Sequence, residues 1–154
     1  MDAEQGRQSS GSGSPAMGRA ESLGRQDRER LNPPNVHTPQ ANYSHVARAG
    51  NTLYIAGQVP VDPDGNLVGR GDAEDQADRC YRNLIAIVEH FGGTADNIMK
   101  LTTFITNWEF RAQVGRARDR LFRPPWPAST LVVISALASA DFLVEIEAIA
   151  VLDE

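Results

Sequence analysis

The spacing of apolar residues predicts two helices in the second part of the chain. Apolar side chains recur every three or four positions from Ala77 to Phe91, which is the spacing of one helix face. Asp72 precedes this stretch as an N-cap, and Gly92-Gly93 ends it. A second helix is predicted over 109–122, because the prolines that follow forbid its continuation.

Runs of β-branched and apolar residues between turn signals predict the strands. These strands are expected at 44–48, 52–58, 98–106, 129–135 and 143–152, with a short apolar stretch at 67–68. The order of elements is therefore β-β-(β)-α-β-α-β-β.

Two strands are apolar on both faces. In the last strand the even positions from Val144 to Leu152 are all apolar, and we expect them to lie under the two helices. The odd face is half apolar, and the strand at 129–135 shows the same property. Two helices can cover only one face of such a sheet, so the pattern predicts that the other face packs against a second copy of the chain.

Residues 1–40 have the composition of a disordered tail, and the domain is expected to span 41–154. The tail contains five glycines, five serines and four prolines, and no aromatic residue. Such a segment cannot bury enough apolar surface to offset its ordering entropy. Its end, residues 30–35, could still dock on the domain.

Charge and composition exclude several classes of protein. The 154 residues have a formal net charge of −5, and all of this excess lies in 41–154, which argues against a nucleic-acid partner. The apolar runs are far too short for a membrane span, and no secretory leader is evident, so a cytoplasmic protein is expected. The single cysteine, Cys80, lies on the apolar helix stripe and is interpreted as a packing residue.

Candidate chemistry is sparse. The three histidines lack the spacing of metal ligands, so no metal site is predicted. Glu145 and Glu147 project from the same, half-apolar face of the last strand. If that face is buried in an assembly, one carboxyl is partly desolvated and its pKa rises, which suits a general acid or base. The alternative is an ion pair with arginines of a neighbouring copy.

Four sequence blocks in the predicted domain resemble the RidA (YjgF) family. They are Asn-Tyr-Ser at 42–44, Ile-Ala-Gly-Gln-Val-Pro-Val-Asp at 55–62, Pro-Ala-Ser-Thr at 127–130 and Glu-Ile-Glu-Ala-Ile-Ala-Val at 145–151. Their order and spacing match the family over about 41–152.

The resemblance implies a fold, an assembly and a reaction. The fold is α+β and chorismate-mutase-like, a mixed sheet with two helices on one face. The assembly is a homotrimer with an inner barrel and ligand clefts between subunits. Typical members hydrolyse reactive 2-imino or 2-enamino acids to 2-oxo acids and ammonia, without a cofactor, and so remove damaging metabolites.

The resemblance also assigns roles to residues. Glu145 corresponds to the family glutamate that positions the attacking water, and Tyr43 to a tyrosine near the cleft. The carbonyl of Gly57 is expected to help hold water. The backbone N–H of Leu131 is expected to meet an oxygen of the ligand.

The chain departs from the family pattern at the substrate anchor. Ser129 stands where deaminating members carry an arginine that clamps the substrate carboxylate. Gly115 replaces a frequent asparagine, and His45 a frequent glutamine. The sequence therefore resembles an arginine-lacking branch, in which Arg48, Arg123 or an arginine of a neighbouring copy could take over the anchor. The expected function is hydrolysis of an imine or enamine; the alternative is a non-catalytic homotrimer that binds a small ligand or a partner.

Overall fold

The computed structural model describes residues 28–154 of the chain. Its strands and helices are β1 (Arg28–Leu31), β2 (Val46–Ala49), β3 (Thr52–Gln58), α1 (Ala73–His90), η2 (Ala95–Asn97), β4 (Ile98–Ile105), η3 (Trp108–Phe110), α2 (Arg111–Leu121), β5 (Ala128–Val133) and β6 (Val144–Val151). Apart from β1 and the single-turn helices, these match the elements predicted from the sequence.

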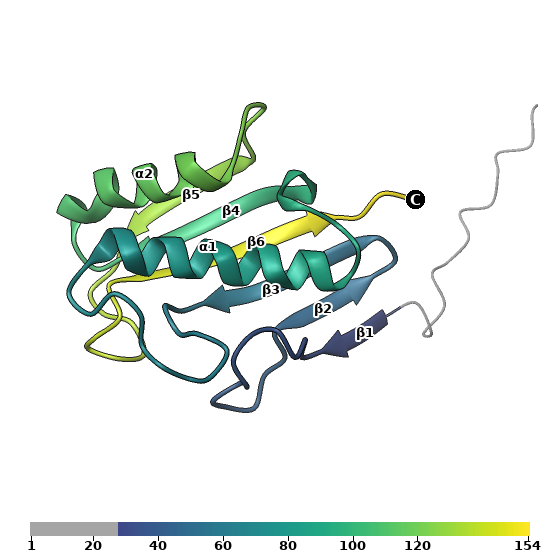
Figure 1. Ribbon diagram of the computed structural model, residues 1–154, viewed down its shortest axis with the longest axis horizontal. Helices are drawn as coiled ribbons and strands as arrows, with labels where there is room; N and C mark the ends of the chain where they lie inside the picture. Colours follow the sequence, from purple (N-terminus) through teal and green to yellow (C-terminus); the bar gives the residue numbers. More distant parts are fainter. Residues whose placement is uncertain (1–27) are drawn as a thin grey trace, which may run out of the picture.

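One six-stranded sheet, in the order β1-β2-β3-β6-β4-β5, forms the centre of the fold. Neighbouring strands are antiparallel except β4 and β5, which are parallel because α2 crosses between them. Both α1 and α2 lie on one side of the sheet (Figure 1). The expected α+β fold with two helices on one face is therefore confirmed. We call this side the helical face and the opposite side the open face.

The helical face buries the apolar pattern seen in the sequence. In β6 the even positions Val144, Ile146, Ala148 and Ala150 are at most 4% exposed. The stripe of α1 that includes Leu84 packs on them. The side chain of Asp72 caps α1 by accepting hydrogen bonds from two backbone N–H groups of its first turn. Among residues 28–154, no helix has both the length and the apolar character needed to span a bilayer.

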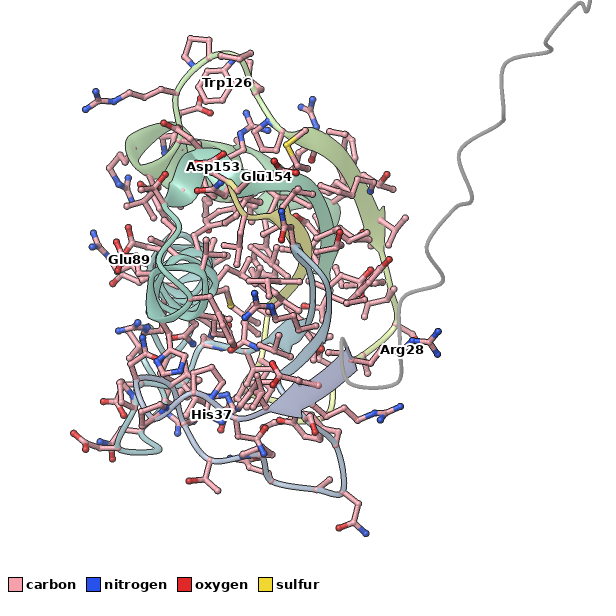
Figure 2. All side chains as sticks on the ribbon, turned by 90° about the vertical axis from the view of Figure 1, so that its right-hand side faces the viewer. Arg28, His37, Glu89, Trp126, Asp153 and Glu154 are labelled. Carbon is pink, nitrogen blue, oxygen red and sulfur yellow. The ribbon has the colours of Figure 1, made fainter. Side chains whose placement is uncertain are left out.

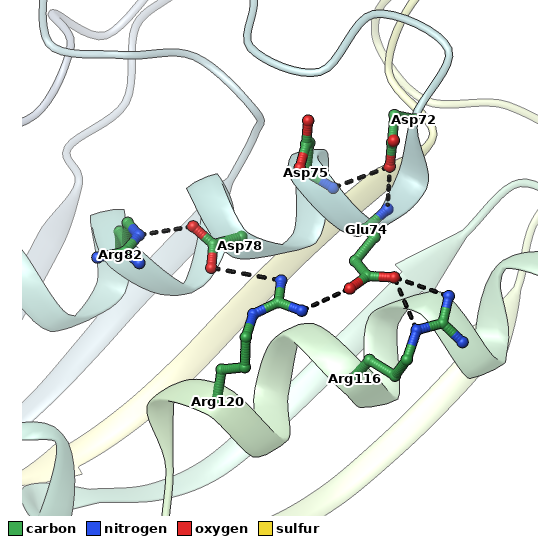
Figure 3. Close-up of polar contacts among 7 residues, drawn as sticks. All are labelled: Asp72, Glu74, Asp75, Asp78, Arg82, Arg116 and Arg120. Carbon is green, nitrogen blue, oxygen red and sulfur yellow. Dashed lines mark hydrogen bonds and ion pairs between the residues drawn. The ribbon is translucent and has the colours of Figure 1, made fainter.

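A group of ion pairs joins α1 to α2 on the outer surface (Figure 3). Glu74 of α1 pairs with Arg116 at 2.7 Å and also with Arg120. Asp78 of α1 pairs with Arg82 and, at 3.7 Å, with Arg120. These groups are largely solvent-exposed, so the burial of apolar side chains beneath the helices, rather than these pairs, dominates the packing energy.

The fold begins earlier than the composition suggested. Residues 28–40 were expected to belong to a tail, but β1 pairs with β2 along all four of its residues. Val36 and His37 in the segment that follows are buried, and the Asn35 side chain donates to the carbonyl of Ala86 in α1. Figure 2 labels His37 on the α1 side of β1. The folded part therefore begins before residue 40, in agreement with the docking considered for 30–35, and the rest of the expected tail, 1–27, lies outside the described residues.

The open face has no helix over it in the described part of the chain (Figure 2). The odd residues of β6, from Glu145 to Val151, share it with alternate residues of the neighbouring strands. Tyr54 is 51% exposed there, and Val132 and Val151 are also exposed. This confirms that the strands are apolar on both faces.

Candidate functional site

Glu145 lies on the open face next to a glycine that makes room for it. In the register of β6 and β4 it is opposite Phe104, which is opposite Val132 of β5, so all three project to the same side. A Cβ atom at Gly57 would lie 2.0 Å from Glu145 Oε1. Any larger residue at position 57 would push the Glu145 carboxyl out of this position, so its placement depends on the glycine.

The environment of Glu145 disfavours its charged form. Burial raises the pKa of this carboxyl, and the negative charge of Glu147 raises it further. Within residues 28–154, no lysine, arginine or histidine comes within ion-pair distance of Glu145. The alternative, an ion pair with arginines of a neighbouring copy, involves a second chain and stays a prediction. A raised pKa makes a carboxyl a better proton acceptor and brings it closer to the range in which it can both accept and return a proton.

Tyr43 lies beside this carboxyl and remains accessible. Burial of part of the ring raises the pKa of the phenol, and the charge of Glu145 also raises it, while the backbone of Gln40 lowers it. The ring is 40% exposed and packs edge-on against His45, with the centroids 5.5 Å apart. Tyr43 is within electrostatic range of Glu145, which adjoins Gly57, and we call these three residues from separate segments the cluster.

A buried hydrogen-bond network supports Tyr43. The Nε2 of His45 lies 2.7 Å from the carbonyl of His37, and Gln58 Nε2 lies 3.2 Å from His45 Nδ1. Because a carbonyl only accepts and an amide NH₂ only donates, His45 carries its proton on Nε2 and is neutral. Burial lowers the pKa of His45, which favours the same state.

Sequence reasoning missed this network. His37 was assigned to the tail and His45 was seen only as a departure from the family. A glutamine in an otherwise apolar strand, Gln58, was the available signal, since a buried amide needs partners.

The other predicted site residues lie elsewhere in the chain. Ser129 and Leu131 of β5 stand opposite Leu101 and Thr103 of β4, which are buried under the helices. Ser129 and Leu131 therefore project toward the helical face, on the opposite side of the sheet from Glu145.

Gly115 lies in α2, which packs on the helical face, and an added Cβ there would meet nothing within 4 Å. Within one chain, the structure does not bring Gly115, Ser129 or Leu131 to Glu145.

The arginines considered as replacement anchors do not reach the cluster either. The side chain of Arg48 donates to the carbonyl of Gly50 and lies over the ring of Phe91, 5.9 Å from its centroid. Arg123 follows α2 at the far end of the helical layer and forms no ion pair within 28–154. Neither supplies a cation to Glu145 in the same chain.

A shallow pocket of about 370 Å³ adjoins the cluster on the open face. Its lining includes Tyr54, Lys100, Glu147 and Ile149. The Lys100 ammonium donates to Thr130 Oγ1 at 3.0 Å. The open face therefore offers both a charged and an apolar surface next to Glu145.

Comparison with known proteins shows the family. A family model described as Endoribonuclease L-PSP matches residues 34–152, so the chain belongs to this family, which is also called RidA or YjgF. It is 35% identical to a RutC family protein of Pyrococcus horikoshii, over 75% of this chain and 91% of the relative. It is 28% identical to a 2-iminobutanoate/2-iminopropanoate deaminase of Dermatophagoides farinae, over 80% of this chain and 95% of the relative.

Solved structures agree with this assignment. The crystal structure of RidA from the Antarctic bacterium Psychrobacter superposes with a TM-score of 0.75 at 28% identity, over 81% of this chain and all of that one. The family whose members include imine deaminases is thus the family of this chain, and the RidA resemblance is confirmed.

Proposed function

We propose that the protein is a cofactor-free hydrolase that converts a reactive imine or enamine into a carbonyl compound and ammonia. The observation that carries this proposal is the Glu145 carboxyl, which is half-buried beside Gly57 with its pKa raised and without a cationic partner in residues 28–154. The deaminase name of the Dermatophagoides farinae relative supports the same chemistry.

The reaction needs one group that moves a proton in both directions. Glu145 accepts a proton from water as the water oxygen adds to the carbon of the protonated imine, and a neutral carbinolamine forms. The carboxyl then gives this proton to the amine nitrogen. The C–N bond breaks as the carboxylate takes the hydroxyl proton, ammonia and the carbonyl compound leave, and the carboxyl releases its proton to solvent. A carboxyl with a pKa nearer to neutrality serves both steps better than an ordinary one. The phenol of Tyr43 forms one wall for the substrate, and the Gly57 carbonyl holds the water.

The complete cleft is shared between subunits of a homotrimer. Ser129 and the N–H of Leu131 lie on the opposite side of the sheet from Glu145 in one chain, so they join it only across an interface. The exposed apolar residues of the open face, such as Tyr54 and Val132, favour such an interface. Ser129 offers one neutral hydrogen bond, so any charge of the substrate is bound by another group of the cleft.

Ammonia release tests the proposal. 2-Iminobutanoate is generated in situ from 2-aminobutanoate by an amino-acid oxidase, and semicarbazide traps the imine that escapes hydrolysis. Glu145→Gln should reduce the acceleration roughly 100-fold or more, the usual contribution of a general acid–base group. Glu147→Gln, on the same strand and face but more exposed, is the matched comparison; it removes only the charge that helps to raise the Glu145 pKa and should lose far less activity than Glu145→Gln.

Equal activity of Glu145→Gln and the parent protein would contradict the assigned role. The alternative, a non-catalytic homotrimer, predicts a different result. In that case the parent protein accelerates no imine hydrolysis, and a small ligand that shifts its melting temperature is recovered unchanged.

A further inference from the structure

The first strand places an arginine on the open face. In the register of β1, β2 and β3, Arg30 is opposite Ala47, which is opposite Tyr54. Tyr54 is exposed on the open face, so Arg30 projects to that side as well. Glu29, the next residue along the strand, projects to the other side. The strand thus separates its two kinds of charge between the faces of the sheet.

Arg30 lines a polar hollow that contains no acidic residue. The hollow measures about 670 Å³, and its polar lining includes Arg30, Asn32, Asn42, Tyr43 and Ser44. The Asn32 Oδ1 atom accepts the backbone N–H of His45, which leaves its NH₂ group available as a donor. Within residues 28–154, no carboxylate lies within ion-pair distance of Arg30. The hollow therefore presents a cation and several donors without a negative charge of its own.

Tyr43 connects this hollow to the proposed hydrolytic group. Tyr43 lines the hollow together with Arg30, and its phenol is within electrostatic range of Glu145. The hollow also shares Ser44 and Ala47 with the pocket that contains Glu147. A small molecule held at Arg30 can therefore extend past Tyr43 toward Glu145.

We propose that Arg30 is the anion-binding residue of this cleft and that the natural ligand carries a carboxylate. This inference rests on the proposed function, because it assigns the charge of the substrate that Glu145 acts on. A planar guanidinium flanked by amide donors matches the two oxygens of a carboxylate through a pair of parallel hydrogen bonds. Arg30 thus takes the role that Ser129 cannot fill, from a different strand and a different face of the sheet.

Binding of a stable carboxylate tests the assignment. The probes are 2-oxobutanoate and its neutral counterpart 2-oxobutanamide, titrated by calorimetry against the full-length protein. Arg30→Gln should weaken 2-oxobutanoate binding roughly 10- to 100-fold, the range for a hydrogen bond between charged groups. Binding of 2-oxobutanamide should change less than about twofold. Arg30→Lys keeps the charge and should lose an intermediate amount.

Arg28→Gln is the matched control, because Arg28 lies on the same strand and face but does not line the hollow. It should leave 2-oxobutanoate affinity within about twofold of the parent value. An equal loss in Arg28→Gln and Arg30→Gln would mean a diffuse charge effect and would overturn the assignment. So would unchanged affinity in Arg30→Gln, equal losses for both probes, or no binding of 2-oxobutanoate by the parent protein. If Arg30→Gln does not fold, Arg30→Lys takes its place. Weaker binding of 2-oxobutanoate by Arg30→Lys then supports the assignment, and unchanged affinity overturns it.

Failure of this inference can be separated from failure of the proposed function. If Glu145→Gln loses turnover while Arg30→Gln binds normally, the hydrolase proposal stands and the assignment of Arg30 is wrong. If Arg30→Gln loses affinity for 2-oxobutanoate while Glu145→Gln hydrolyses imines at the parent rate, the anion site stands and the proposed reaction is wrong.

Discussion

The two faces of the sheet differ in composition and in whether the chain's own helices cover them. Along β6 the even residues, Val144 to Ala150, are apolar and buried under the helices, whereas Glu145 and Glu147 alternate with them on the open face. The helical face is complete within one chain. The open face combines exposed apolar side chains with carboxyls, a lysine and an arginine, so it is suited to binding a ligand or further copies of the chain.

The difference has an energetic reason. A carboxylate on the helical face would be fully buried without a partner, which costs several kcal/mol in general. On the open face a partly buried carboxyl keeps some contact with water and only shifts its pKa. The proposed acid–base group therefore lies on the face that the helices leave uncovered.

The largest effect on stability is expected from a matched pair of substitutions in β6. Ile146→Ala removes a fully buried side chain from the helical face and should lower the free energy of unfolding by about 2–5 kcal/mol. Ile149→Ala makes the same change on the open face and should cost far less in the isolated chain. Urea unfolding at several protein concentrations separates folding from assembly. If Ile146→Ala and Ile149→Ala lowered the free energy of unfolding equally at every protein concentration, the two faces would not differ in their contribution to folding.

A charge on the open face should act on assembly rather than on folding. Val132 is 39% exposed in the single chain, so Val132→Asp should leave the fold intact. In a homotrimer the same aspartate is buried at an interface without a partner and should shift the protein to single copies. Sedimentation equilibrium measures the mass, with Val132→Thr as the isosteric control. A trimer that survives the aspartate would show that this part of the face is not an interface.

A smaller effect is expected in the dependence of stability on pH. Burial lowers the pKa of His45 below the unfolded value of 6.5. The unfolded state therefore binds the proton first, so stability is full above pH 6.5 and falls as the pH drops toward the lower folded pKa. His45→Gln should flatten this slope. The free energy of unfolding, measured between about pH 5 and 8, tests this expectation. His90→Gln, at an exposed histidine, is the control. An equal change of slope in both variants would contradict the role of His45.

The smallest effect is expected on the outer surface of the helical layer. Glu74→Gln weakens the pairs with Arg116 and Arg120, which are exposed and screened by solvent. The melting temperature should fall several-fold less than in Ile146→Ala. The difference should also vanish in about 1 M sodium chloride, where the Debye length is about 3 Å. A loss as large as that of Ile146→Ala would mean that these pairs, and not the apolar core, hold the helices on the sheet.

Local pattern was enough to place most elements but not the first strand. Asp72 and Gly92 bound α1 as predicted, since a cap and a glycine with φ near 84° act within one turn. β1 has the sequence Arg-Glu-Arg-Leu, without any apolar alternation. It is a strand because β2 offers it backbone partners, and no window of sequence contains that information.

The candidate site likewise has features that the sequence predicted and features that depend on strand pairing. The alternation of β6 predicted the face of Glu145, and the family blocks pointed to Tyr43 and Gly57. The contact between Gly57 and Glu145 depends on the irregular register of β3 and β6 between Ile55 and Gln58. The separation of Ser129 from Glu145 depends on the pairing of β4 with β5.

What the sequence by itself determined is the set of local elements, their buried faces and the family, because periodicity and caps act over a few residues. Only the tertiary structure decided that residues 28–40 belong to the fold, that His37, His45 and Gln58 bond to one another, and that Arg30 shares a hollow with Tyr43. These relations join residues that are distant along the chain. They arise from strand pairing and from the hydrogen bonds that buried polar groups require.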